Sequence, residues 1–268
     1  MRHVREYGHS GPRIIVLHGG PGASGHMAPV ARELAGSYRV VEPFQRRSSD
    51  LRLTVARHVA HLHEVSNFAG GCPPAILAAS WGAMLALAYA ATHPSSTGPL
   101  ILVGCGTFDL AARAELQKNI AERMNDEIRS RLKCADQLDQ DERLKASAEA
   151  MMPIYSYDVR ASPHEEDKVD ARAHHETWDD MVRLQAKGIY PAAFATIRVP
   201  ILMVHGTFDP LPGRLIFAGL RPYLPQLEYR ELERCGHYPW LEMAAADAFF
   251  SLVREWLAGK LDADGMTC

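Results

Sequence analysis

A serine lies where a predicted buried strand changes into a helix. The segment Ile76–Leu85 reads Ile-Leu-Ala-Ala-Ser-Trp-Gly-Ala-Met-Leu, so the apolar run ends at Ser80 and a helical run starts directly after it. A turn this sharp strains the serine backbone, lifts its hydroxyl clear of the sheet and requires small residues two positions away on either side. Ala78 and Gly82 occupy those positions. The pattern predicts that Ser80 is a nucleophile.

A serine hydroxyl needs a base, and the base needs a group that orients it. Two later apolar runs are each followed by a suitable side chain, since Asp209 follows Ile201–Val204 and His237 follows Leu227–Leu232. Both side chains lie beyond the carboxyl ends of their strands, where open parallel sheets bind ligands. We therefore expect His237 to act as the base and Asp209 to orient it.

A second carboxylate competes with Asp209 for this task. Asp109 ends the tetrapeptide Gly-Thr-Phe-Asp, which is repeated at Gly206–Asp209, and it follows the preceding strand. Asp209 is favoured because it precedes His237 by one strand and one helix. Asp109 is expected instead to cap the first helix of the segment that follows it.

A glycine cluster, His18-Gly19-Gly20-Pro21-Gly22, directly follows the first buried strand. It lacks the Gly-x-Gly-x-x-Gly pattern of nucleotide loops, and Pro21 has no N–H to offer a phosphate. Glycines let the backbone approach a reacting carbonyl, so the N–H groups of Gly20 and Trp81 are expected to form an oxyanion hole beside Ser80. A purely structural turn is the alternative.

Two groups of histidines in the sequence could suggest a metal site. His58, His61 and His63 flank one face of a predicted helix, but no carboxylate or cysteine completes a ligand set at helical spacing. A solvated or partly buried face is expected there, and His174-His175-Glu176 is interpreted as polar surface. We expect no metal and no cofactor.

The elements that must position these residues alternate between strands and helices. One helix is predicted after a capping Thr54, and another over Trp81–His93. Strands are predicted at Ile14–Leu17, Tyr38–Phe44, Ala75–Ala78, Leu100–Val103, Ile201–Val204 and Leu227–Leu232. This alternation predicts an α/β fold, with a mostly parallel sheet flanked by helices.

The strand pattern stops between Thr107 and about Tyr190. Apolar residues recur every four positions from Leu116 to Leu132, as on an amphipathic helix. We interpret residues 107–198 as a helical cap inserted into one domain, whose core comprises residues 1–106 and 199–268. Residues 107–190 hold 18 acidic and 13 basic side chains. One hypothesis is that they line a pocket for a cationic amine, but a neutral small ester or amide is favoured.

Composition limits the partners. With 29 Lys+Arg against 32 Asp+Glu, the chain lacks the basic excess typical of nucleic-acid binding, and its 47% apolar content is that of a globular protein. The charged amino terminus does not resemble a signal peptide, and prolines and Gly82 interrupt the apolar segment Pro73–Ala91, so neither export nor membrane insertion is expected. Five scattered cysteines favour reduced thiols. We expect a cytoplasmic protein with a small-molecule substrate; its oligomeric state is left open.

The motifs resemble those of the α/β-hydrolase superfamily, and within it the proline iminopeptidase-like group. The shared stretches are His18–Gly22, Ser80–Gly82 continuing through Leu85–Ala90 to His93-Pro94, His205–Asp209 and Gly236–Pro239. The chain order Ser80, Asp209, His237 is also that of the superfamily. The resemblance implies the α/β-hydrolase fold with a helical cap, a triad of these three residues, and Gly20 and Trp81 as oxyanion donors.

Two departures limit what the resemblance implies about the substrate. The peptidases carry Asp-Gln-Arg-Gly-x-Gly-x-Ser where Phe44–Leu51 keeps only Gln45-Arg46, and Ala78-Ala79 replaces their Gly-Gly. Peptidase specificity is therefore not carried over. We expect a cofactor-independent serine hydrolase that cleaves a small ester or amide. The alternatives are an iminopeptidase-like aminopeptidase, hydrolysis of a carbon–carbon bond, and a slow-turnover ligand-binding protein.

Overall fold

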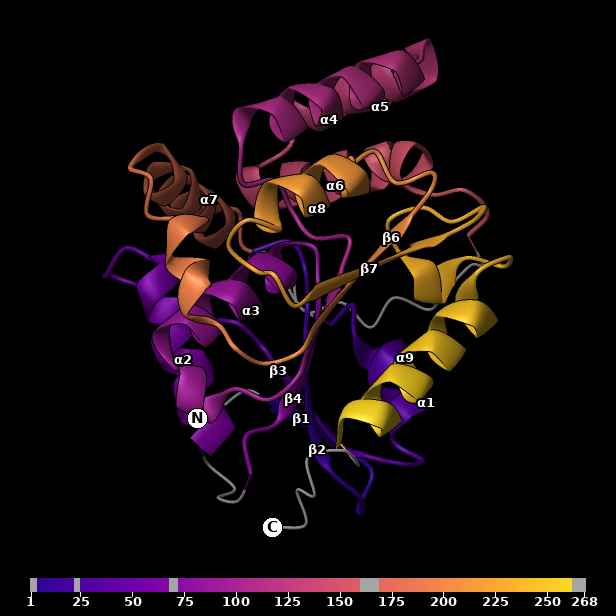
Figure 1. The fold of residues 1–268 in the computed structure, drawn as a ribbon. Coiled ribbons are helices and arrows are strands. Elements are labelled where there is room, and N and C mark those ends of the chain that lie inside the picture. Colours follow the sequence, from indigo (N-terminus) through magenta and orange to yellow (C-terminus); the bar gives the residue numbers. More distant parts are fainter. Residues whose placement is uncertain (1–3, 22–24, 68–71, 160–168, 262–268) are drawn as a thin grey trace.

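A seven-stranded sheet forms the centre of the computed structural model, which describes residues 4–21, 25–67, 72–159 and 169–261 (Figure 1). The strand order is β1-β3-β2-β4-β5-β6-β7. The pair β1 and β3 is antiparallel and every other neighbouring pair is parallel, which confirms the predicted sheet type. The strands span Val4–Tyr7 (β1), Arg13–Leu17 (β2), Arg39–Pro43 (β3), Ala75–Ala79 (β4), Leu100–Val103 (β5), Ile201–Gly206 (β6) and Leu227–Leu232 (β7).

Helices cover both faces of this sheet, because successive strand residues point to opposite sides. Ile15 and Leu17 of β2 belong to the apolar core shared with α2, α3 and α8, whereas Ile14 and Val16 belong to the core shared with α1 and α9. The helices that flank the sheet span Ala28–Leu34 (α1), Val55–Asn67 (α2), Trp81–Thr92 (α3), Gly213–Leu220 (α8) and Ala246–Leu261 (α9).

The edge strand β1 was not predicted. Its four residues carry Arg5 and Glu6 and are at most half-buried, so no apolar run marks them in the sequence. Tyr7 at its end donates a hydrogen bond to Glu42 of β3 (Oη to Oε2, 2.8 Å), and that carboxylate is fully buried. The strand therefore depends on its pairing with β3 rather than on a pattern of its own.

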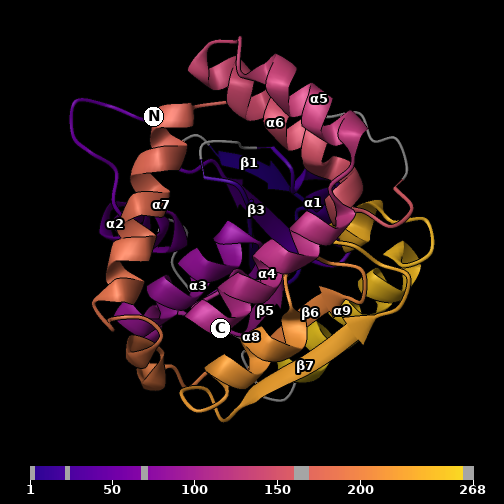
Figure 2. The ribbon, with the colours of Figure 1, turned by 90° about the horizontal axis from the view of Figure 1, so that it is seen from above.

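Between β5 and β6 the described residues form four further α-helices, which lie over one end of the sheet (Figures 1 and 2). They are α4 (Leu110–Arg123), α5 (Asp126–Ala135), α6 (Gln140–Tyr155) and α7 (Ala171–Ala186). The expectation of a single amphipathic helix over Leu116–Leu132 was wrong. The side chain of Asn125 accepts a hydrogen bond from the N–H of Ile128 and starts a new helix there, which divides the pattern into α4 and α5.

Acidic side chains fasten α7 to the core. Glu176 accepts the N–H of Leu53 (2.7 Å), and Asp180 accepts the N–H of Val55 (2.8 Å). Val55 is the first residue of α2, where the backbone N–H groups have no partner inside the helix and the helix dipole favours an anion. Part of the negative charge of the insertion therefore serves to dock it.

The cysteines and the apolar segment Pro73–Ala91 bear on redox state and membrane insertion. Cys105, Cys134 and Cys235 are free thiols, but Cys72 is disulfide-bonded, so the expectation of reduced cysteines was wrong at that position. The apolar segment Pro73–Ala91 divides into β4 and α3 as predicted. Within the described ranges, none of the helices has the length and apolarity needed to cross a membrane.

Candidate active site

Ser80 occupies a strained turn between β4 and α3. Its φ is 54° and its ψ is −120°, a conformation that side chains other than glycine rarely adopt. Neighbouring atoms lie too close for larger residues, since a Cβ on Gly19 would lie 2.8 Å from the Ser80 Cβ and 3.2 Å from the Ala79 carbonyl oxygen. A Cβ on Gly82 would lie 2.6 Å from the carbonyl oxygen of His18. The small residues at 19 and 82 thus allow the strand–serine–helix turn to form against the first loop.

His237 and Asp209 form a buried hydrogen-bonded pair. The His237 Nδ1 lies 2.8 Å from Asp209 Oδ2, and the other carboxylate oxygen accepts the N–H of Leu211 at 3.0 Å. Asp209 lies just beyond β6 and His237 in the loop after β7, as the chain order predicted. Because Nδ1 donates to the carboxylate, a neutral His237 ring carries its lone pair on Nε2, the nitrogen that a base would use.

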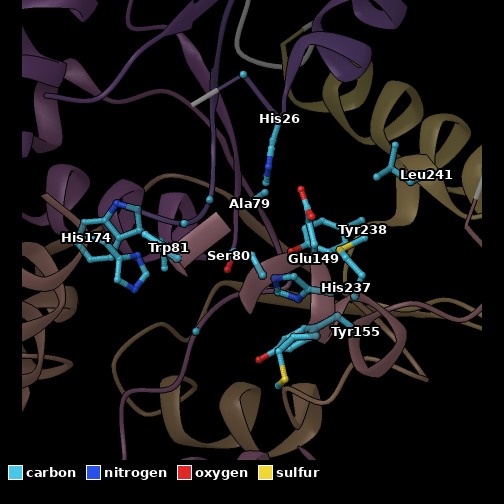
Figure 3. Close-up of a pocket in the computed structure, with 18 of the residues that line it drawn as sticks. His26, Ala79, Ser80, Trp81, Glu149, Tyr155, His174, His237, Tyr238 and Leu241 are labelled. Atoms are coloured by element: carbon cyan, nitrogen blue, oxygen red, sulfur yellow. The ribbon is translucent and has the colours of Figure 1, made fainter. Parts of the chain in front are cut away.

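Ser80 and His237 line the same cavity, and their side chains lie next to one another in Figure 3. The structure thus brings together the three residues that the sequence grouped from widely separated positions. Asp109, the competing acid, has another partner. Its carboxylate accepts the N–H of Ala112 at 2.8 Å and caps α4, which confirms the interpretation of this residue as a helix cap.

Gly104 packs against the imidazole ring of His237, and the sequence analysis did not predict this role. It follows β5 with a φ of +55°, and a Cβ at this position would lie 2.7 Å from both Nδ1 and Cε1 of His237. The same Cβ would lie 3.2 Å from Asp209 Oδ2. The imidazole therefore packs directly on this backbone. A glycine immediately after a buried strand was the available signal, because such a glycine often marks a close approach of another group.

The predicted oxyanion donors border the cavity as well. Gly20, with a φ of 47°, and Trp81 both line it beside Ser80. Trp81 is the first residue of α3, so its N–H has no acceptor within the helix and is available to a bound group. The two N–H groups therefore come from the two segments that meet at the serine.

A buried network joins these two segments. Gln45 Oε1 accepts the indole N–H of Trp81 at 2.7 Å, while its amide Nε2 donates to the His18 carbonyl oxygen at 2.8 Å. The backbone N–H of Gln45 donates to His18 Nε2 at 3.2 Å. Burial lowers the pKa of His18 to about 4, so the ring is neutral and accepts this bond. Gln45 is one of the two residues that this chain shares with the peptidase motif. It links the glycine loop at His18 to α3, the helix that follows Ser80.

The cavity has a volume of about 530 Å³ and lies between the sheet and the inserted helices. Apolar side chains of those helices form much of its wall, namely Leu116, Leu144, Met151, Met152 and Trp178. Arg32 and Lys145 also border it, whereas Glu149 is the one carboxylate among its described lining residues. Among the described residues of the insertion, the acidic side chains other than Glu149 do not line the cavity, and some of them dock α7, so the hypothesis of an acidic lining is wrong for that part; Glu165, Glu166 and Asp167 lie outside the described residues.

His174 also lines the cavity, although the sequence placed it on polar surface. Its Nδ1 lies 2.9 Å from the carbonyl oxygen of Pro21, and burial lowers its pKa below the usual value. Its ring contacts Trp178 edge-on. No local pattern distinguishes His174 from its neighbour His175, because the difference arises only when α7 is docked.

The second histidine group consists of His58, His61 and His63 in α2. The partly buried face that was expected is found, since His61 and His63 are half-buried and His58 is buried, and the His58 Nε2 lies 3.0 Å from the hydroxyl of Thr177 in α7. Burial lowers the pKa of His58 to about 3. Across the described ranges, no group of three His, Cys, Asp or Glu side chains is arranged to hold a metal ion.

A curated hydrolase is similar to this chain over most of its length. The chain is 27% identical to 2-hydroxy-6-oxononadienedioate/2-hydroxy-6-oxononatrienedioate hydrolase 2 of Pseudomonas putida over an alignment of 286 positions, gaps included, that covers 95% of this chain and 91% of that protein.

Solved structures share the architecture at lower identity. VinJ matches with a TM-score of 0.69 and 18% identity, over 96% of this chain and 94% of that one. Proline iminopeptidase of Mycobacterium smegmatis matches with a TM-score of 0.65 and 19% identity (97% and 95% covered). The enol-lactonase of Burkholderia xenovorans matches with a TM-score of 0.63 and 16% identity (96% and 96% covered). These three similarities establish the fold. Since residues 14–251 also match the model of the alpha/beta hydrolase family, the chain belongs to that family.

Proposed function

We propose that the protein is a serine hydrolase that cleaves a small ester or amide through an acyl-enzyme. The observation that supports this most directly is a strained Ser80 at the wall of a cavity that is shared with the His237–Asp209 pair. Strain at a non-glycine residue is stable only when the surrounding structure imposes it, and such positions are concentrated at active sites.

In this mechanism the Ser80 hydroxyl attacks the carbonyl carbon of the substrate, and its proton passes to His237 Nε2. Asp209 holds the ring by Nδ1 and stabilises the imidazolium that forms. The N–H groups of Gly20 and Trp81 stabilise the oxyanion, and the loss of one such donor typically costs about 100- to 1,000-fold in rate. His237 then protonates the leaving group, and water resolves the acyl-enzyme by the reverse sequence.

The inserted helices would act as the cap, residues 107–198, and select the substrate. Their apolar side chains line much of the cavity, which favours an acyl or leaving group with substantial apolar surface. The cavity is too small for a folded protein substrate and suits a single small molecule.

A second candidate is the hydrolysis of an oxo dicarboxylic acid, the kind of substrate named for the Pseudomonas putida relative. Arg32 and Lys145 are among the described residues that line the cavity, and Glu149 is the one carboxylate among those residues, which accords with an anionic substrate. Turnover of a 2-hydroxy-6-oxo dicarboxylate at a rate above that of matched neutral esters would establish this candidate in place of the first.

The test is covalent labelling combined with turnover. A fluorophosphonate should label Ser80 stoichiometrically, and Ser80→Ala should abolish both labelling and hydrolysis of an activated aryl ester while the circular dichroism spectrum is retained. Ser251→Ala, on the exposed side of α9, is the matched control and should leave both unchanged. If Ser80→Ala keeps more than a few per cent of the activity, Ser80 is not the nucleophile.

A further inference from the structure

Glu242 is a fully buried carboxylate five residues after His237. It accepts hydrogen bonds from three backbone N–H groups. Its Oε1 accepts from Gly236 and from Tyr157, each at 2.9 Å, and its Oε2 accepts from Asp158 at 2.6 Å. None of the steps proposed above uses this group.

The three donors come from two segments that are far apart in the sequence. Gly236 immediately precedes His237, whereas Tyr157 and Asp158 belong to the stretch that leaves α6, the third inserted helix. One side chain therefore joins the loop of the proposed base to the end of an inserted helix. Figure 3 shows Tyr155, the last residue of α6, beside His237.

Backbone contacts reinforce the same junction. The N–H of His237 donates to the Tyr155 carbonyl oxygen at 2.7 Å, and the Tyr155 ring meets the imidazole edge-on with 5.4 Å between centroids. The segments are packed so closely that a Cβ on Gly236 would lie 2.2 Å from the Tyr155 carbonyl oxygen. The N–H of Met243 also donates to the carbonyl oxygen of Asp158 at 2.8 Å.

A carboxylate suits this position better than any neutral side chain. It accepts on both oxygens and donates nothing, so it can satisfy all three N–H groups at once. Hydrogen bonds to an ionised acceptor are also stronger than those to a neutral one. A glutamine at 242 would turn an NH₂ group toward at least one of the three backbone donors, and that donor would lose its partner.

We propose that Glu242 is a positioning residue, which fixes the His237 loop against the end of α6 and thereby sets the imidazole between Asp209 and Ser80. The proposal rests on the proposed serine hydrolase function, because it concerns the placement of the base in that reaction. It makes the end of α6 part of the framework that holds the base, in addition to any role the inserted helices have in binding substrate.

The variant Glu242→Gln tests this proposal, with Glu42→Gln as the matched control. Glu42 is equally buried, but it lies in β3, where its carboxylate accepts from the Tyr7 hydroxyl, and it does not line the cavity. For each variant, kcat and KM for an activated ester are measured per active site, with the sites counted by fluorophosphonate titration. Thermal unfolding is followed in parallel.

We expect both variants to unfold at lower temperature, and only Glu242→Gln to lose at least tenfold in kcat per titrated site, with KM changed less than threefold. A purely structural role would reduce the number of titrated sites and leave kcat per site intact. If kcat per site stays within threefold of that of Glu42→Gln, the proposal is wrong.

Should Glu242→Gln not fold, Glu242→Asp replaces it, since it keeps the charge on a side chain one methylene shorter. A fall of more than threefold in its kcat per site supports the proposal, and an unchanged value overturns it. Failure of the proposed function itself would be seen separately, as an unlabelled Ser80 in the unaltered protein.

Discussion

Replacing Gly104 by alanine should disable His237 without unfolding the protein. The added Cβ would lie 2.7 Å from Nδ1 and Cε1 of the imidazole, about 0.7 Å closer than ordinary van der Waals contact. Since the backbone at 104 hydrogen-bonds to β6 through its N–H (2.9 Å to the Val204 carbonyl oxygen), the ring is the part that must move.

The size of the effect follows from the distances around the ring. A shift of about 0.7 Å can lengthen the Nδ1 to Asp209 Oδ2 distance from 2.8 Å to about 3.5 Å, the limit of a useful hydrogen bond. Misplacing a catalytic group by about 1 Å costs about 100-fold in rate, equivalent to about 2.7 kcal/mol of transition-state stabilisation. We therefore expect kcat/KM to fall by at least about 100-fold, with about 10,000-fold as the limit if the orienting bond is lost altogether.

Gly188→Ala is the matched control, because Gly188 has a φ of +68° but nothing within 4 Å of an added Cβ. Both variants suffer the same left-handed backbone penalty, about 1–2 kcal/mol of unfolding free energy. Urea unfolding would measure that penalty, and ester hydrolysis per folded molecule would measure the effect on the ring. The packing argument would be refuted if Gly104→Ala were as active per folded molecule as Gly188→Ala.

Three other outcomes are expected. Asp209→Asn should lower kcat by about 10,000-fold through the wrong imidazole tautomer, whereas Asp109→Asn should affect mainly the stability of α4; the reverse ranking in steady-state kinetics would move the acid to the earlier strand. Burial lowers the pKa values of three histidines, to about 4 for His18, about 3 for His58 and about 4 for His205. These rings bind protons in the unfolded chain first, so the free energy of unfolding should fall as the pH drops below about 6.5, by about 2 kcal/mol for each ring at pH 5; a flat denaturation profile from pH 7 to 5 would contradict this sign. Finally, because Glu149 is the one carboxylate among the described residues that line the cavity, N-acetylation of prolyl and alanyl arylamides should change kcat/KM by less than tenfold; a larger loss would instead support an aminopeptidase.

The sheet and the position of Ser80 could be predicted because their signals are local. A buried parallel strand is a short apolar run, and the turn at Ser80 requires small residues at fixed offsets within one stretch of chain. The grouping of Asp209 with His237 needed one further rule, that parallel strands present their carboxyl ends at the same edge. The edge strand β1 failed these criteria because its residues are neither buried nor alternating.

The residues that support the site could not be predicted, because their roles arise from contacts between distant segments. Gly104 acts through a ring 133 positions later in the chain, and Glu242 through N–H groups that follow α6. In the sequence, Glu242 is only one acid a few residues before α9. His174 and Asp180 likewise gain their roles when α7 docks, and helical periodicity does not encode which neighbour a helix face meets.

The insertion begins and ends on adjacent strands, since Leu100 of β5 pairs with Ile201 of β6. A segment with this attachment can lengthen, shorten or be exchanged between relatives without changing the register of the sheet. The proposed nucleophile precedes the insertion in the chain and the proposed acid and base follow it, so the proposed reacting groups belong to the sheet and its loops, whereas side chains of the insertion form much of the cavity wall as a separate module. Such modularity fits a fold that is shared, at 19% and 16% identity to this chain, by an iminopeptidase and an enol-lactonase. It also limits the exchange, because a replacement segment must still present N–H groups to Glu242 where the insertion runs past the His237 loop.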